Sequence, residues 1–146
     1  MANSARSKIN SLGATMQSLN WLAITVAALC SFLLGGPWYS KALFGAVWNR
    51  EANMTKPAGS GHPAKVFGLS FVFAFIAAAG FAYWLGPNPA LDTALERGLL
   101  AGLCFVATSF GINYQFANRS TLLWLIDGGY HTTQFLLFGL VLGLWH

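Results

Sequence analysis

The sequence predicts an all-α membrane protein in which four transmembrane helices form an antiparallel bundle. Hydrophobic residues make up 55% of the 146-residue chain and charged residues only 8%, whereas a soluble domain carries about 25% charged residues. Four stretches are mostly apolar over the roughly 20 residues that a membrane span requires. No stretch shows the sustained alternation of polar and apolar residues that would indicate strands. The length allows one domain, a four-span region over residues 20–146 behind a polar tail at residues 1–19.

Charged residues and turns mark the ends of the spans. Lys65 and the turn "GPNPALD" bracket the second span, Arg97 and Arg119 bracket the third, and only Asp127 interrupts the fourth. A signal peptide is the alternative for the first, but its apolar run continues past any small-residue cleavage site, so we expect a mature helix. The predicted spans cover about residues 21–39, 66–86, 98–118 and 121–145.

The connections differ in length and character. The loop over residues 41–64 opens with "KALFGAVWNR", which predicts a short interfacial helix, and continues as a Gly/Pro-rich linker. The other connections are short, so neighbouring spans should run antiparallel. Because lipid gives helices no hydrophobic reason to associate, small residues should form their contacts. Small residues repeat every fourth position at Ala74, Ala78 and Ala82, at Gly98 and Gly102, and at Gly139 and Gly143.

Basic residues near the spans favour one orientation, because they concentrate on the cytoplasmic side. The first and third connections should therefore lie inside and both termini outside. The side of the first and third connections holds five basic residues, Lys41, Arg50, Lys56, Lys65 and Arg119. The side of the two termini holds three, Arg6, Lys8 and Arg97.

Polar residues recur at i, i+3, i+4 and i+7 in the fourth span, which places them on one helical face. A polar face surrounded by lipid must turn toward protein or water. The topology brings this face to the ends of the first and third spans. The predicted intramembrane cluster contains Trp38, Tyr39, Asn113, Tyr114, Asp127, Tyr130, His131 and Gln134.

Three interpretations of this cluster remain open. The side chains can join helices by hydrogen bonds. Asp127 and His131 can instead form a proton or ion path, since intramembrane ionisable residues often do. They can also be metal or haem ligands, although two ligands fall short of the three or four that metal sites usually have.

The sequence contains no recognisable catalytic motif, such as H-E-x-x-H, G-x-S-x-G or a phosphate loop, and only four carboxylates. We therefore expect no enzyme, no catalytic or metal site and no cofactor. Basic residues form no run that would indicate nucleic acid. Cys30 and Cys104 lie in apolar segments and are expected to be inert thiols. Lipids, other membrane subunits or further copies of the chain are the expected partners.

The segments "NWLAITVAALCSFLLGGPWYSKALFGAVW" and "LWLIDGGYHTTQFLLFGLVLGLW" resemble a family of small bacterial membrane proteins catalogued as a domain of unknown function. Its hallmarks are an Asn-Trp start, Trp-Tyr-Ser followed by Phe-Gly, an Asn-Tyr pair and a Gly-Tyr-His element. Here they correspond to Asn20–Trp21, Trp38–Ser40, Phe44–Gly45, Asn113–Tyr114 and Gly129–His131. The resemblance implies four spans in a bacterial inner membrane and lends no activity.

Two positions depart from that family's pattern. Asp127 stands where the family typically has Asn, and Lys41 replaces a usual Pro. The two residues could form a local ion pair, but an Asn elsewhere indicates that the position needs a hydrogen-bonding side chain more than a charge. We therefore expect a non-enzymatic oligomer or accessory subunit of a membrane complex. The alternatives are a small transporter or channel using Asp127 and His131, and a cofactor- or pigment-associated subunit.

Overall fold

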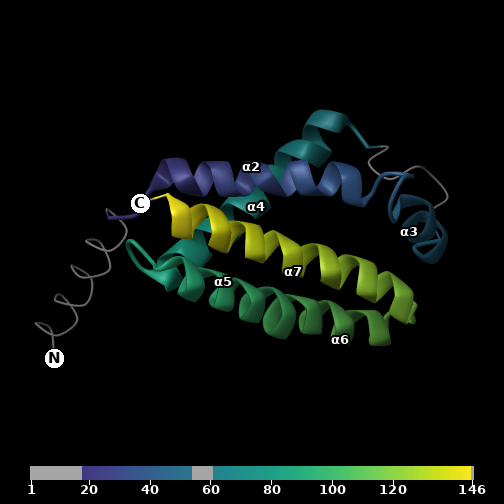
Figure 1. Ribbon diagram of the computed structural model, residues 1–146. Coiled ribbons are helices and arrows are strands. Elements are labelled where there is room, and N and C mark those ends of the chain that lie inside the picture. The colour runs from purple at the N-terminus through teal and green to yellow at the C-terminus, as the bar shows by residue number, and fades with distance from the viewer. Residues whose placement is uncertain (1–17, 54–60, 146) are drawn as a thin grey trace, which may run out of the picture.

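The computed structural model describes residues 18–53 and 61–145, and within them every regular element is helical (Figure 1). This confirms the all-α prediction. The first long helix and the short helix after it are α2 (Trp21–Trp38) and α3 (Gly45–Glu51). The later elements are α4 (Pro63–Leu85), α5 (Leu91–Leu100), the π-helix η1 (Ala101–Ala107), α6 (Thr108–Phe116) and α7 (Thr121–Leu144).

Three of these helices are long and apolar enough to cross a membrane: α2, α4 and the continuous helix from Leu91 to Phe116. Helix α7 is as long, with 24 residues, but Asp127, His131 and Gln134 lower its hydropathy. Its position explains why it tolerates them. In Figure 1, α7 lies between α2 and the α5–α6 helix, and it packs against α2, α3, α4, α5, η1 and α6. A helix enclosed by others exposes little of its surface to the surroundings.

The third long helix begins at Leu91, earlier than the predicted start at Gly98, so the preceding connection is only Gly86–Ala90. The first turns of α5 carry Asp92, Glu96 and Arg97. Because of these charges, the sequence predicts a connection here and not part of a span. One face of this segment is nevertheless apolar and buried, through Ala94 and Gly98. An amphipathic helix can extend beyond the apolar run.

The predicted small-residue repeats make very close helix contacts. A Cβ on Gly98 would lie 2.6 Å from the Phe135 carbonyl oxygen, and one on Gly102 would lie 2.5 Å from Cα of Thr132. From the other side, Gly139 packs against the backbone of Ala94. The α5–η1 and α7 backbones therefore approach so closely that no side chain fits between them. The alanine repeat of α4, Ala74, Ala78 and Ala82, is buried in the core with α2.

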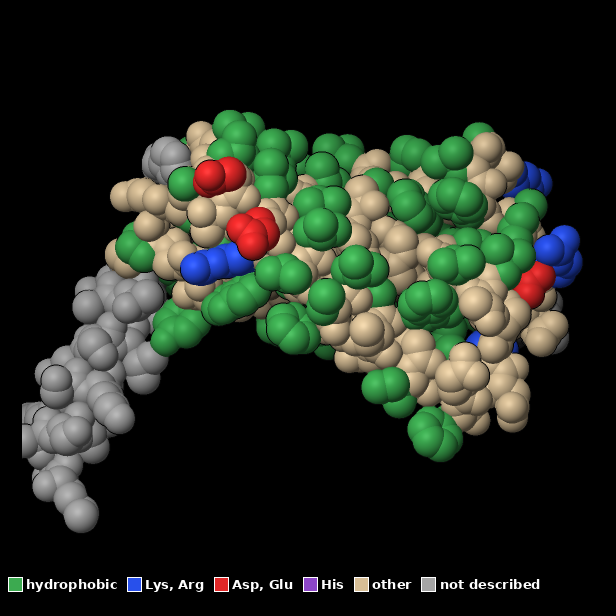
Figure 2. Space-filling view, turned by 60° about the horizontal axis from the view of Figure 1, so that its bottom comes forward, with side chains coloured by type: hydrophobic (Ala, Val, Ile, Leu, Met, Phe, Trp, Pro, Cys, Tyr) green, Lys and Arg blue, Asp and Glu red, His purple; other side chains and the backbone are tan. Residues whose placement is uncertain are grey.

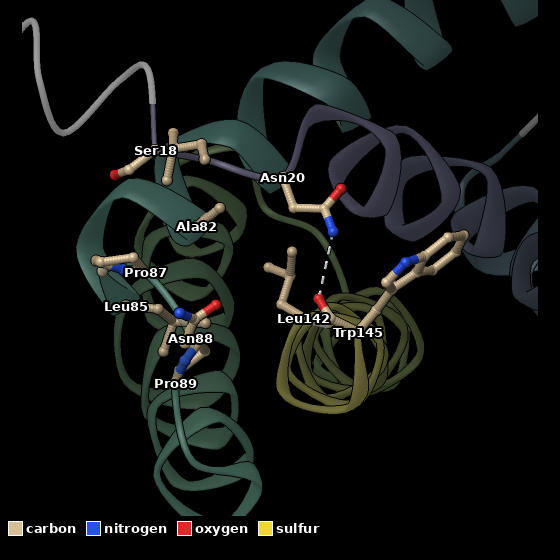
Figure 3. A pocket seen from close by; sticks show the side chains of 11 residues that line it. Ser18, Asn20, Ala82, Leu85, Pro87, Asn88, Pro89, Leu142 and Trp145 are labelled. Atoms are coloured by element: carbon tan, nitrogen blue, oxygen red, sulfur yellow. Dashed lines mark hydrogen bonds between the residues drawn. The ribbon is translucent and has the colours of Figure 1, made fainter.

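The ends of α2 and α7 meet at both ends of the molecule. Asn20 caps α2 by accepting a hydrogen bond from Ala23 N (3.0 Å). Its amide also donates to the carbonyl of Trp145 (3.5 Å), and Figure 3 shows this second contact. Beside this contact lies a cavity of about 30 Å³, room for about one water molecule. Leu19, assigned by sequence to the polar tail, is buried at this end. Residues 1–17 of that tail and residues 54–60 of the predicted linker lie outside the described residues.

The described surface is predominantly hydrophobic. Figure 2 shows Lys, Arg, Asp and Glu side chains at the two ends of the visible face and hydrophobic side chains between them. Several large side chains are largely exposed, among them Leu33, Phe73, Phe105, Ile112 and Phe116. Such a continuous apolar surface requires lipid or protein as its surroundings.

Candidate functional site: a buried polar cluster

Asp127 is the centre of the cluster, and it is only 5% exposed. Its Oδ1 accepts hydrogen bonds from the Tyr39 hydroxyl and the Trp48 indole N–H, both 2.8 Å long. Its Oδ2 accepts one from the Tyr114 hydroxyl at 2.7 Å. Three neutral donors from three different parts of the fold therefore surround one carboxylate, which reduces the cost of burying it.

The chain brings these donors together through a reversal after α2. Pro37 lies in the last turn of α2, and Tyr39 follows the helix. A Cβ on Gly45 would clash with the backbone carbonyls of Tyr39 and Ser40. Only a glycine permits this approach, and it lets α3 fold back so that Trp48 reaches Asp127. The short helix predicted from the sequence is thus present, and it contributes a hydrogen-bond donor to the cluster.

A second group of polar residues lies deeper along α7. The Gln134 amide donates to the hydroxyl of Ser31 (2.9 Å), and its Oε1 lies 2.8 Å from His131 Nδ1. The Tyr130 hydroxyl donates to the Ser31 carbonyl (3.1 Å). These contacts join α2 to the middle of α7.

Aromatic rings fill the space around both groups. Phe110 stacks on the His131 imidazole with centroids 4.9 Å apart, and Tyr130 contacts the rings of both Trp38 and Tyr39. The Trp38 indole N–H donates to the Ile126 carbonyl (3.1 Å). The polar tips are therefore paired, and the rings pack around them.

The π-helix η1 supports the cluster from the third long helix. A π turn shifts the backbone ladder, so carbonyls around it need other donors. The Trp124 indole N–H donates to the Ala107 carbonyl (2.7 Å), and the Thr108 hydroxyl donates to the Cys104 carbonyl (2.6 Å). Trp124 thereby connects α7 to the end of η1, one helix turn before Asp127.

The ion pair considered for Asp127 and Lys41 does not form. Lys41 is exposed, and within residues 18–53 and 61–145 the one salt bridge joins Arg50 to Glu51 at 3.0 Å. At the end of α3, the hydrogen bond with the Ser120 hydroxyl, followed by Arg50, lowers the pKa of the Glu51 carboxyl. Arg119 donates to the Ala52 carbonyl (3.2 Å). These contacts hold the end of α3 to the turn that precedes α7.

The structure brings together seven of the eight residues that the sequence placed in the cluster. Asn113 is exposed and lies outside it, because it neighbours Tyr114 on the helix and the two side chains face different directions. Sequence reasoning missed Trp48, Ser31 and Phe110. The spacing of Ser31 could have predicted its place. It lies four residues before Gly35 and seven before Trp38, which puts all three on one helical face.

The chemistry of the cluster is that of an internal hydrogen-bond network. In the described part of the chain, no three His, Cys, Asp or Glu residues gather as metal ligands do. Neither the 30 Å³ cavity nor a second, apolar groove between α4 and η1 is lined by Asp127 or His131.

The described chain is all-helical, and it has helices long and apolar enough to span a membrane. Together with the buried carboxylate that joins them, these helices define a protein of the membrane-embedded type. Residues 22–143 match the family described as "Protein of unknown function (DUF1761)". The chain therefore belongs to that family, as its motifs indicated. No curated protein and no solved structure matches the chain.

Proposed function

We propose that this protein is a non-enzymatic, four-span component of the bacterial inner membrane that acts as an accessory subunit or homo-oligomer. The observation that carries the proposal is the internal pairing of Asp127. Three side chains of the same chain occupy its two oxygens. A carboxylate held in this way stabilises the bundle, and the exposed apolar surface is then the part of the molecule that meets partners.

The fourth span of this proposal is α7. Its length of 24 residues corresponds to about 36 Å at 1.5 Å per residue, more than the roughly 30 Å of the hydrocarbon core. The start of α2 contacts the end of α7, and the residue after α2 contacts Asp127 near the start of α7. These contacts support an antiparallel arrangement.

The proposed orientation, with the first connection inside, rests on the basic residues. Cysteines introduced at Ser60 and at Asn88 should react from opposite sides of intact cells, with Asn88→Cys accessible to an impermeant reagent from outside. Labelling of Ser60→Cys from outside would reverse the orientation and leave the number of spans unchanged.

A transporter is the second candidate, supported by the two polar groups that follow one another along α7, one around Asp127 and one around Gln134 and Ser31. Beyond Gln134 the same helix buries Phe138, which is 0% exposed, and Leu142. A path for ions must reach both membrane faces, and an apolar plug of this kind interrupts it. The interruption favours the structural role.

The test separates the two candidates. The tagged protein would be extracted from its native membrane in mild detergent, its mass measured by light scattering, and the same sample reconstituted in liposomes. We expect a defined oligomer or a complex of fixed stoichiometry and no proton flux under an imposed gradient. A monomer whose proton flux disappears in Asp127→Asn would overturn the proposal.

A further inference from the structure

Beyond the cluster, an apolar groove of about 330 Å³ opens between α4 and η1. Its lining contains no charged or hydrogen-bonding side chain apart from the indole of Trp84, and consists of Ala77, Gly80, Phe81, Trp84, Ala101, Phe105, Val106 and Phe135. Helix α4 packs mainly against α2, so the side of α4 that faces η1 is left open. The volume falls within the roughly 300–1,000 Å³ of ordinary ligand sites.

The groove has a buried floor and exposed walls. Phe81 and Ala101 are almost completely buried, whereas Trp84 and Phe105 are 46% and 62% exposed. The two wall rings approach each other edge to face, with centroids 6.5 Å apart. A flexible, unbranched apolar chain suits such a shape.

A cation lies at one end of the groove. The Arg97 guanidinium lies over the Trp84 ring, 5.5 Å from its centroid, and donates to the carbonyls of Trp84 (3.1 Å) and Leu85 (3.5 Å) at the end of α4. Both bonds use Nη1, and a guanidinium has five N–H donors. Among the described residues no carboxylate pairs with Arg97, although Asp92 and Glu96 are near in sequence.

We propose that this groove is a phospholipid site, in which one acyl chain lies between α4 and η1 and the phosphate binds Arg97. The apolar lining matches the chain, and the guanidinium, which no carboxylate neutralises, matches the phosphate in charge and geometry. The Trp84 ring lies between them, where an aromatic residue meets both the hydrocarbon and the headgroup region. The occupant is a lipid of the bilayer and not a second copy of the protein.

Glycines of α4 provide a matched pair of variants. A Cβ on Gly80 or on Gly68 would meet nothing within 4 Å, so both positions have open space where a side chain would begin. Gly80 lines the groove and Gly68 does not. Gly80→Leu fills the groove, and Gly68→Leu makes the same chemical change elsewhere on the same exposed helix.

The experiment uses native mass spectrometry of the protein released from nanodiscs that contain equal amounts of phosphatidylglycerol and phosphatidylethanolamine. We expect one phospholipid to remain bound to the wild type and to Gly68→Leu, and to be lost from Gly80→Leu. Arg97→Gln should lower the retained fraction several-fold, and Arg97→Lys should restore only part of it, because the charge returns without the paired donors of the guanidinium. Unchanged retention in Gly80→Leu would overturn the proposal. A wild-type dimer that Gly80→Leu converts to a monomer would overturn it also, by assigning the groove to a second copy.

Discussion

The two halves of α7 are held in opposite ways. From Asp127 to Gln134, side chains reach out to α2, α3 and α6 through hydrogen bonds. From Phe135 onward, glycines bring the backbone into direct contact with α5, as at Gly139 and Gly143. The polar half depends on side chains that donate and accept hydrogen bonds, whereas the apolar half depends on glycines that have no side chain. Each half should therefore fail under a different kind of substitution.

The largest effect is expected in the polar half, from Asp127→Leu. This change leaves three donors without an acceptor, and each buried unpaired group costs about 1–3 kcal/mol. Thermal unfolding in detergent should show loss of most of the folded protein.

Asp127→Asn is the matched control for that experiment. Its amide oxygen can still accept from Tyr39 and Trp48, and the Tyr114 hydroxyl can turn to accept from the amide N–H. We expect most of the stability to remain. If Asp127→Asn lost as much stability as Asp127→Leu, the charge and not the hydrogen bonding would be the essential property.

The second largest effect is expected in the apolar half, from Gly139→Ala. The added methyl would meet the backbone carbonyl of Ala94, and backbone atoms cannot move aside as a side chain can. Overpacking of this kind costs about 1–3 kcal/mol. The midpoint of thermal unfolding should fall.

Gly36→Ala provides the comparison, because a Cβ there meets nothing within 4 Å. Alanine is favoured over glycine in a helix by up to about 1 kcal/mol, so this variant should be as stable as the wild type or slightly more. Equal destabilisation of both variants would show that helix contact at Gly139 is not the cause.

The sequence predicted the local parts of this arrangement and missed the parts that depend on distant contacts. The stripe from Asp127 to Gln134 follows from helical periodicity, and the glycine repeats follow from their four-residue spacing. The role of Trp48 could not be predicted, because it depends on the close approach of Gly45 to the chain before it. The sequence places both Asn113 and Tyr114 at the end of the third span, but the π-helical turn, which sets the rotation of α6, leaves no clear sequence signal of which of the two faces the cluster.

A smaller effect is expected from Trp48→Phe. The ring can still pack against Tyr39, with which Trp48 makes an edge contact, but the indole N–H to Asp127 is lost. One hydrogen bond of two neutral partners contributes about 0.5–1.5 kcal/mol, and more when one partner is charged. Thermal unfolding in detergent should register a loss smaller than that of Asp127→Leu. The control is Trp21→Phe, since Trp21 is 43% exposed and should change little.

The smallest effect is expected from Lys41→Met, which tests whether charge contributes to the polar half at all. Lys41 is exposed and Asp127 has its donors from Tyr39, Trp48 and Tyr114, so the stability should change by no more than about 0.5 kcal/mol, as for most surface positions. A long cationic side chain at a membrane edge reaches water without a partner. The double variant with Asp127→Asn measures any coupling between the two residues. Additive effects are expected, because the residues share no contact. If Lys41→Met were harmful alone and harmless beside Asp127→Asn, the two charges would interact in the membrane, and Asp127 would be held by an ion pair that the hydrogen bonds only supplement.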